Sequence, residues 1–311
     1  MLKKRLFVSA YAFVFACGFM LHNARAQTPA TSDVQDSQFL KTDFLASLKP
    51  DQAAIDALPA NIKDTKTLVV GGETTLAPYL FIQDGKITGI EADFMQALEK
   101  VLGVKIKVVD TGFSSMVIGL LSKRVDVAMS DFSDTAAREQ QVNFVDYTKT
   151  GQMLVVAKDN PLKINSIADL CGHTAAGPTG SLSVQLAQQQ SLTCVSEGKP
   201  KVNVMTYPTG ADTYLALMAG RVDTTGIDYA IAAHQVASSD GKLQLAGTLF
   251  AQGYHGAAIA KDNPQLQNAL LLAFQSIYAQ GAAAKILAKW DVTQMAMPTP
   301  EVNAATMTTK N

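Results

Sequence analysis

The chain has 311 residues, of which 48% are hydrophobic and 17% are charged, and its formal net charge is −1. This composition is typical of a folded globular protein, and the length allows a large core and two lobes. A charge this close to zero, without any basic tract, argues against a nucleic-acid-binding protein.

The N-terminus has the pattern of an export signal. A basic start, Met1 to Arg5, precedes an apolar run from Leu6 to Leu21, and Ala24-Arg25-Ala26 has the form of a cleavage site. We therefore predict that residues 1–26 are a cleaved signal peptide and that the remainder is periplasmic. Cleavage would remove four of the 26 basic residues and none of the 27 acidic ones, which leaves a net charge of −5.

Two other interpretations of this N-terminus stay open. A transmembrane anchor would need about 18–20 apolar residues, and the run from Leu6 to Leu21 has 16. Lipid attachment at Cys17 is the second alternative, although Phe15 is large for its place before such a cysteine. Simple cleavage after Ala26 remains the prediction.

Two cysteines, Cys171 and Cys194, remain in the predicted exported part, 23 residues apart. Export implies an oxidising compartment, so we predict a disulfide between them. Two buried free thiols are the alternative. A disulfide that closes a loop of this size stabilises a protein by about 3 kcal/mol in the chain-entropy description.

The first elements along the chain surround a glycine pair. Residues 27–65 are polar and Ala-rich and read as a leader, with a short helix expected within Phe39 to Leu48. A strand is expected at Thr67 to Val70, followed by Gly71-Gly72. Glycines at a strand end let the backbone come close to a ligand, and Glu73 would project from that end. An ordinary turn with a solvated glutamate would use the same residues.

Helices and strands then alternate. We expect a hairpin around Asp84-Gly85, an amphipathic helix from Ala92 to Leu102 and a strand from Val104 to Val108. Phe113 precedes another helix. This alternation favours an α/β fold.

A polar run follows the short apolar strand from Val125 to Met129. Ser130, Asp131 and Ser133 stand where backbone N–H groups and hydroxyls become free, which is common at ligand sites. Arg138 supplies a planar fork for a carboxylate. The competing interpretation is an ordinary helix cap with Arg138 solvated on the surface.

In the second half, Thr174 to Gly177 reads as a strand, and Pro178-Thr179-Gly180-Ser181 opens a helix. The N-terminus of a helix presents free N–H groups and positive potential to an anion, which makes Thr179 a candidate contact. Simple N-capping would use the same residues.

Two stretches of the chain echo each other. Gly119 to Asp131 reads GLLSKRVDVAMSD, and Ala216 to Asp228 reads ALMAGRVDTTGID, with an offset of 97. Both run from a helix end through Arg-Val-Asp and a short strand to an aspartate. The echo indicates two lobes of like design. Each lobe would send a strand end into a shared crevice, where open α/β sheets bind ligands.

In their order and spacing these features resemble the periplasmic solute-binding proteins of the polar amino-acid type, the exported partners of ABC importers. The resemblance covers Leu68 to Asp291. It rests on six motifs: Leu76-Ala77-Pro78-Tyr79-Leu80-Phe81, Gly89-Ile90-Glu91-Ala92-Asp93-Phe94, Ser130 to Arg138 with Val142-Asn143-Phe144, Asp169-Leu170-Cys171-Gly172, Gly220 to Asp228, and Lys285 to Trp290.

The resemblance implies a type II periplasmic-binding-protein fold, in which two α/β lobes, each a sheet flanked by helices, are joined by two crossover hinge strands. It also implies an amino-acid ligand, a membrane permease as partner, a monomer, no cofactor and no metal. The expected division is a signal peptide at 1–26, a leader at 27–65, lobe 1 at 66–154, lobe 2 at 155–252, a return to lobe 1 at 253–297 and a tail at 298–311.

Site residues follow from the resemblance by position. It implies that Arg138 binds the ligand α-carboxylate with help from Ser133 and Thr179, and that Asp228 binds the α-ammonium. Phe113 would pack on the ligand side chain, Glu73 would contact its far end, and Ser130 and Asp131 complete the set. An amino-acid zwitterion needs a fixed cation and a fixed anion, and opposite lobes supply them, so only the closed state satisfies both charges.

The chain departs from the family pattern at Asp131, where Gly or Ser is usual, at Leu76, where an aromatic is common, and at Pro178-Thr179. Because buried unpaired carboxylates are costly, Asp131 and Glu73 together favour a basic amino acid or a related diamine. A neutral polar amino acid is the alternative, because Leu76 weakens a cation-stacking site.

Two further function classes fit the sequence less well. An exported enzyme resembling cyclohexadienyl dehydratase would use the same fold, but the four histidines show no metal spacing and no nucleophile motif appears. A membrane-bound sensor domain would need a spanning segment after Trp290. We predict a binding protein that is not an enzyme.

Overall fold

The computed structural model describes residues 38–305; the predicted signal peptide and Cys17 lie outside this range. The first elements are a 3-10 helix η1 (Asp43–Ser47) and two short helices, α1 (Gln52–Ala57) and α2 (Ala60–Thr65). The 3-10 helix lies within the stretch where a short helix was expected, whereas α1 and α2 were not predicted. Leu45, Ala54 and Ile62 are buried in the main core. Residues 38–65 are therefore part of the folded body rather than a loose leader.

Lobe 1 is built on three parallel strands, with β1 (Thr67–Gly72) between β5 (Lys105–Asp110) and β6 (Val127–Ala128). Its helices are α3 (Ile90–Leu102), α4 (Met116–Leu121), α9 (Pro264–Ala279) and α10 (Ala282–Lys289). The expected hairpin is confirmed as β3 (Leu80–Gln83) and β4 (Lys86–Thr88), which Asp84 and Gly85 join with positive φ angles of 51° and 73°. A short strand, β2 (Thr75–Leu76), pairs with β3.

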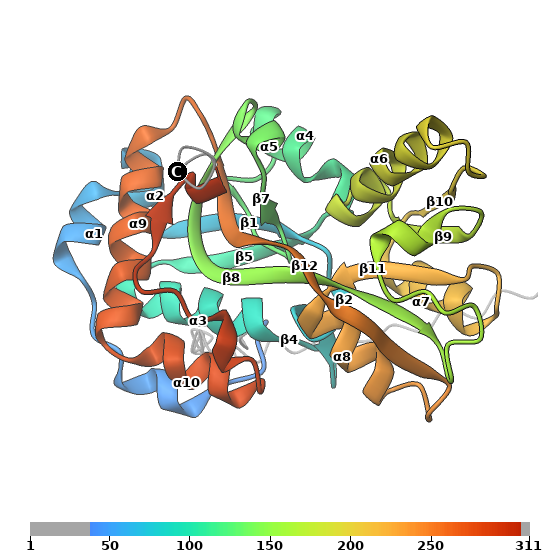
Figure 1. The fold of residues 1–311 in the computed structure, drawn as a ribbon. Coiled ribbons are helices and arrows are strands. Elements are labelled where there is room, and N and C mark those ends of the chain that lie inside the picture. Colours follow the sequence, from blue (N-terminus) through green and yellow to red (C-terminus); the bar gives the residue numbers. More distant parts are fainter. Residues whose placement is uncertain (1–37, 306–311) are drawn as a thin grey trace, which may run out of the picture. The chain divides into compact units, whose positions relative to one another are not determined.

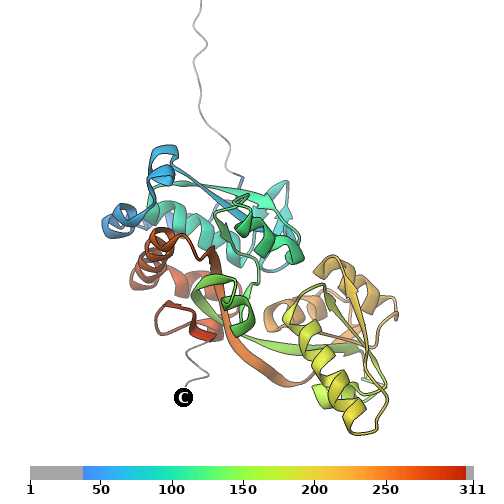
Figure 2. The same ribbon diagram turned by 90° about the horizontal axis from the view of Figure 1, so that it is seen from above.

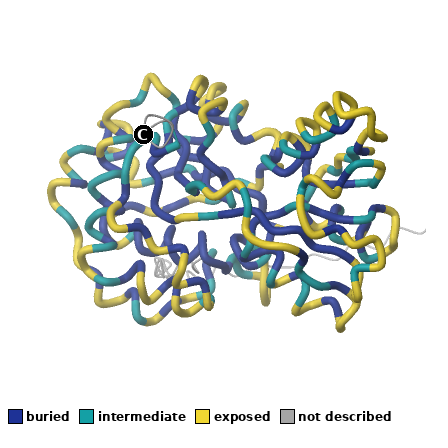
Figure 3. The backbone as a smooth tube through the Cα atoms, viewed as in Figure 1, coloured by how far each residue is buried: buried dark blue, intermediate teal, exposed yellow. Residues whose placement is uncertain are grey.

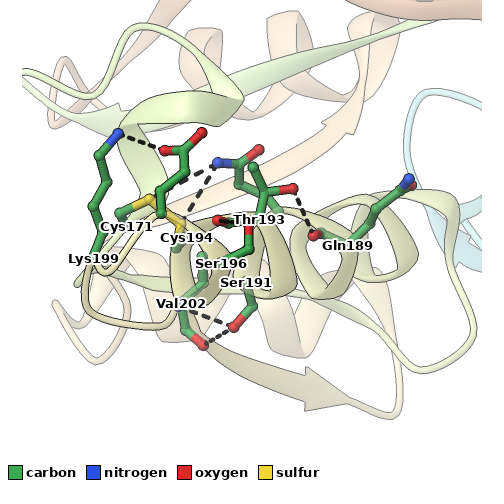
Figure 4. The surroundings of a disulfide bond; sticks show 10 residues. Cys171, Gln189, Ser191, Thr193, Cys194, Ser196, Lys199 and Val202 are labelled. Atoms are coloured by element: carbon green, nitrogen blue, oxygen red, sulfur yellow. Dashed lines mark hydrogen bonds and ion pairs between the residues drawn. A yellow bond between two sulfur atoms is a disulfide. The ribbon is translucent and has the colours of Figure 1, made fainter.

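Lobe 2 is built on three parallel strands, with β9 (Thr174–Pro178) between β10 (Asn203–Tyr207) and β11 (Thr224–Asp228). A 3-10 helix η3 (Ile167–Leu170) and three helices, α6 (Leu182–Ser196), α7 (Gly210–Met218) and α8 (Tyr229–Ala237), complete it. The predicted disulfide between Cys171 and Cys194 is confirmed: it ties the end of η3 to α6, with a Cα–Cα distance of 5.6 Å (Figure 4).

Two long antiparallel strands connect the lobes. β8 (Val142–Ala157) and β12 (Leu243–Ala260) pair from Leu243↔Ala157 to Ala260↔Val142, and in both views they lie side by side (Figures 1 and 2). β11 joins β8 at one end, and β6 joins β12 at the other, which makes one continuous ladder. The predicted two-lobed α/β fold with two crossover strands is confirmed.

The predicted lobe boundaries at 154 and 252 fall inside these two strands. The sequence predicts strands at Met153 to Val156, Lys242 to Ala246 and Ala257 to Ala260 but not the continuous strands, because the middle segments contain Gly, Thr and Lys instead of an apolar alternation. The chain therefore crosses between the lobes along the paired strands β8 and β12 and not at single residues. The predicted division of the chain at residues 154 and 252 stays a prediction.

The sequence echo corresponds to a structural one. Asp126 donates its main-chain N–H to the carbonyl of Val69 at 2.8 Å, and its carboxylate accepts the N–H of Val69 at 2.8 Å. Asp223 makes the same pair of bonds with Thr174, at 2.9 and 2.8 Å. In each lobe, one of these aspartates thus holds a residue near the start of the neighbouring strand.

The core follows the strands. Figure 3 shows the buried backbone running along the sheet and the exposed positions on the outer helices and loops. Within residues 38–305 no single helix is long and apolar enough to span a membrane, although the bent pair α9 and α10 would pass by combined length and composition. The last described elements are the 3-10 helix η4 (Thr293–Met295) and the strand β13 (Glu301–Val302), which pairs with β8.

Candidate functional site

A cavity lies where strand ends of both lobes meet. Its volume is about 30 Å³, which is room for about two water molecules, so its walls lie close together in this structure. Five of the eight predicted ligand residues line it: Glu73, Phe113, Asp131, Ser133 and Asp228. The sequence therefore identified most of the acidic lining.

Asp228 ends β11 and caps the N-terminus of α8, since its Oδ1 accepts the N–H of Ala230 at 2.8 Å. The same Oδ1 accepts the hydroxyl of Tyr79, from lobe 1, at 2.7 Å, and Oδ2 accepts the hydroxyl of Thr150. Asp228 is buried, with 2% of its surface exposed. These bonds fix the carboxylate at the cavity wall.

Arg138 lies in the short helix α5 (Ala136–Glu139), whose N-cap is Thr135 rather than Ser133. Its guanidinium donates from Nη1 to the carbonyl of Ser133 at 2.6 Å and lies over the ring of Phe132, with its Cζ 4.5 Å from the centroid. Nη2 donates to the carbonyl of Gly180, in lobe 2, at 3.1 Å. Burial lowers the pKa of Arg138 to about 10. The alternative of a solvated surface arginine is wrong, because only 7% of Arg138 is exposed.

Glu73 follows β1 and is 2% exposed. Its Oε1 accepts the hydroxyl of Thr75 at 3.1 Å and the N–H of Gly210, at the start of α7 in lobe 2, at 3.2 Å. Its Oε2 has no hydrogen-bond partner within residues 38–305. Burial raises the pKa of Glu73. The alternative of a solvated glutamate is wrong.

Asp131 lies next to His255, which was not predicted as a site residue. Its Oδ1 lies 2.9 Å from Nε2 of His255, and its N–H donates to Oε1 of Glu91 at 3.3 Å. Burial raises the pKa of Asp131 to about 7, against the opposing effect of His255. Asp131 is therefore neither turned to solvent nor unpaired.

Nε2 of His255 also lies 3.8 Å from Oδ2 of Asp228. His255, Asp131 and Asp228 each offer one atom within 4.8 Å of the others. A separation of 2.9 Å between imidazole and carboxylate is that of a direct ion pair, so we treat the three side chains as a proton-binding cluster. Within the described chain they are the residues whose spacing comes nearest to a cation site.

Three predicted residues are not part of the cavity lining: Arg138, whose guanidinium lies behind Ser133, and also Ser130 and Thr179. The hydroxyl of Ser130 is fully buried and donates to the carbonyl of Glu73 at 3.3 Å. Thr179 is exposed and bonds the carbonyl of Tyr207 with both its N–H, at 2.9 Å, and its hydroxyl, at 3.2 Å. Ser181 lies in the lining instead and caps α6.

No sequence pattern marked the other lining residues as ligand contacts, beyond the proximity of some of them to predicted contacts. Leu76 and Pro178 were noted as departures from the family pattern, but not as contacts. The remaining lining residues are Gln152, Ser181, Leu182, Ser183 and Ile227. Gln152 of β8 pairs with Asp228 at the end of β11, and Ile227 pairs with Met153, so the register between these strands carries Gln152 and Ile227 to the cavity.

Comparison with known proteins agrees with this architecture. Residues 68–293 match the bacterial extracellular solute-binding proteins, family 3, and the chain belongs to this family. The L-cystine-binding protein TcyJ of Escherichia coli is 30% identical over 256 residues, which cover 81% of this chain and 93% of that protein.

Two solved proteins have similar structures. An ancestral arginine-binding protein, solved with arginine and with glutamine, superposes with a TM-score of 0.66 at 30% identity; the arginine complex covers 72% of this chain and 98% of its own. The ancestral amino acid-binding protein AncCDT-1, described as a precursor of cyclohexadienyl dehydratase, superposes with a TM-score of 0.66 at 29% identity and covers 74% of this chain and 97% of its own.

Proposed function

We propose that this chain is the exported substrate-binding component of an ABC importer and that it captures one amino acid in the cavity between its lobes. Its family membership supports this proposal. So do the names of its relatives, which describe binders of L-cystine, arginine and glutamine. A membrane permease is then the partner, and periplasmic localisation follows from the predicted signal peptide.

The observation that carries the proposal is a buried cation and a buried anion supplied by different lobes: Asp228 lines the cavity, and Arg138 lies directly behind the lining residue Ser133. Arg138, from lobe 1, has five N–H donors, and its bonds to Ser133 and Gly180 use two of them. The guanidinium therefore keeps donors for a bidentate bond to a ligand α-carboxylate. Asp228, from lobe 2, is held in place to accept the α-ammonium.

Binding and lobe closure are coupled in this arrangement. The contacts of Arg138 with Gly180, of Glu73 with Gly210 and of Tyr79 with Asp228 all cross between the lobes. A ligand that binds Arg138 and Asp228 together adds a further link only when the lobes are closed. A permease that recognises the closed form would thereby sense the loaded protein.

For the ligand we propose a basic amino acid. The Oε2 of Glu73 is a buried carboxylate oxygen without a partner in the described chain, and it lies in the cavity lining. An uncompensated buried carboxylate is costly, and a cationic side chain would offset that cost. A neutral polar amino acid is the second candidate, because Leu76 weakens cation stacking by leaving Phe113 as the aromatic side chain of the lining, and because one relative is named for L-cystine.

We also propose that the protein binds without turnover. The ancestor-like neighbour AncCDT-1 is itself described as an amino acid-binding protein. Incubation with prephenate or arogenate and detection of product would overturn this part of the proposal.

The test is a thermal-shift screen of the protein without residues 1–26 against the twenty amino acids, cystine, ornithine and small amines. A ligand at 100-fold over its Kd should stabilise the folded state by about 2.7 kcal/mol. We expect arginine, lysine or ornithine to give the largest shift. A shift only with glutamine or cystine would replace the basic ligand by a neutral one, and no shift with any amino acid would contradict the proposed function.

A further inference from the structure

His255 is a buried titratable side chain that the proposed amino-acid contacts do not use. It lies in β12 opposite Ser133 of β7 (Ser133–Asp134), and none of its surface is exposed. Its ring packs edge-on against Tyr79, with the centroids 5.3 Å apart. Neither ring nitrogen makes a hydrogen bond within residues 38–305, and Nε2 lies 2.9 Å from Oδ1 of Asp131 as a close ion-pair contact.

The surroundings of the ring are acidic. The ionisable groups that act on it come from four places in the fold: Asp131 after β6, Asp228 at the end of β11, Glu91 of α3 and Asp146 of β8; the ring of Tyr79 packs against it. Burial alone would lower the pKa of His255, but the charges of Asp131 and Asp228 outweigh it and the pKa is raised. The imidazole is therefore in the charged form to a higher pH than a free histidine.

We propose that His255 is a specificity-determining residue: its imidazolium neutralises Asp131 from behind the cavity, so that Asp228 is the carboxylate left for the ligand ammonium. This inference rests on the proposed function, because it assigns the charge that an amino-acid ligand meets. Asp131 is then already neutralised and does not by itself require a second positive charge on the ligand. Glu73, at another part of the lining, is the carboxylate that would attract a positively charged ligand side chain.

The protonation of the His255–Asp131 pair should also make ligand binding depend on pH. A ligand ammonium that binds Asp228 competes with the proton of His255, whose Nε2 lies 3.8 Å from Oδ2 of Asp228. When the ammonium neutralises Asp228, the imidazolium loses part of the negative charge that holds its proton and releases that proton to solvent. Because protons compete with the ligand cation, affinity should rise as pH rises through the range where the pair titrates, which includes the Asp131 pKa of about 7.

The test uses His255→Gln, which keeps an N–H donor near Asp131 but cannot carry a charge. His234→Gln is the matched control, because His234 is exposed on α8 and does not line the cavity. Calorimetric titrations with arginine and with glutamine, at pH 6 and pH 8 and in buffers of different ionisation enthalpy, give affinity and proton release together.

For the unmodified protein and for His234→Gln we expect arginine to bind more tightly at pH 8 than at pH 6, with proton release. In His255→Gln, Asp131 is uncompensated, so the preference for arginine over glutamine should increase about tenfold, the equivalent of one pKa unit, and the proton release should be lost. Asp131→Asn should also lose the proton release without that increase, and it serves as the test should His255→Gln fail to fold.

A folded His255→Gln with unchanged preference and unchanged proton release would overturn the inference. So would stoichiometric binding of Zn²⁺ that depends on His255, because the cluster would then be a metal site. If the unmodified protein binds no amino acid at either pH, the proposed function fails instead, and the two failures are distinguishable.

Discussion

Nη2 of Arg138 donates to the carbonyl oxygen of Gly180 at 3.1 Å, although the two residues belong to different lobes. Gly180 precedes Ser181, the N-cap of α6. The residue expected to bind the ligand α-carboxylate therefore also touches the loop that opens the first helix of lobe 2. This relationship makes Arg138 a sensor of closure as well as a binding group.

The charge of Glu73 is expected to select the ligand side chain. Glu73→Gln removes the buried negative charge while keeping an acceptor for Thr75 and Gly210. Affinity for arginine should fall at least tenfold relative to glutamine, because the unpaired charge no longer attracts a cation. Calorimetry with both amino acids measures this ratio. The control is Glu197→Gln on the exposed surface of lobe 2, and an equal loss for both ligands would contradict the assignment.

Asp93 is expected to be important for stability and not for binding. Its buried carboxylate accepts the hydroxyl of Thr42 at 2.5 Å, Nζ of Lys289 at 2.8 Å and Nε1 of Trp290 at 2.8 Å, so it joins the N-terminal segment to the end of α10. Asp93→Asn leaves the partly exposed ammonium of Lys289 without its anion and weakens the buried bonds from Thr42 and Trp290, so it should lower the free energy of unfolding by about 2 kcal/mol.

Urea denaturation measures the effect of Asp93→Asn. The control is Asp84→Asn at the hairpin turn, where Asn tolerates positive φ equally well. A change below about 0.5 kcal/mol in Asp93→Asn would show that the contacts are energetically neutral.

Two buried carboxyl groups should make stability fall as pH rises. Burial and the neighbouring charge of Asp146 raise the pKa of Asp134 to about 9, and burial raises that of Asp146 to about 6. The folded state therefore retains protons that the unfolded chain releases above about pH 4, and deprotonation on the way to pH 9 opposes folding. Tm should fall between pH 5 and pH 9.

Asp134→Asn should reduce that slope and raise Tm at pH 9, because an amide replaces a carboxylate that must otherwise be buried with its charge. The exposed Asp159→Asn is the control. Thermal unfolding followed by circular dichroism gives the comparison; identical slopes for Asp134→Asn and the unmodified protein would exclude Asp134 as the cause.

The disulfide should stabilise lobe 2 and leave the cavity intact. Replacing Cys171 and Cys194 together by Ser removes a cross-link over 23 residues and should lower the free energy of unfolding by about 3 kcal/mol. Ligand affinity should stay within twofold, since neither residue lines the cavity. Two titratable thiols in the unreduced protein, at these positions, would contradict the disulfide.

Much of this architecture could be predicted because local patterns and tertiary structure agree. Asp84-Gly85 forms the hairpin turn that its residue types favour, and the aspartates of the echo each cap a neighbouring strand. Glu73 and Asp228 were found because strand ends in an α/β sheet point toward one crevice.

The remaining features could not be predicted well. Several depend on contacts between residues far apart in the chain, which no local sequence pattern reveals. His255 pairs with Asp131 from 124 positions away, and a lone histidine in an apolar strand reads as an ordinary core residue. Thr179 has the right residue type, but the strand end turns its hydroxyl toward Tyr207. The helices at 52–65 are too short to show a 3.6-residue period.

The most direct test of the account is the affinity of Arg138→Lys for the amino acid that gives the largest thermal shift. Lysine keeps the charge but loses the fork, so the α-carboxylate loses its bidentate bond, and we expect calorimetry to show at least a hundredfold weaker binding with normal folding. The control, Arg124→Lys, changes an exposed arginine of the same stretch and should bind normally. Unchanged affinity in a folded Arg138→Lys would contradict the central claim that Arg138 holds the ligand.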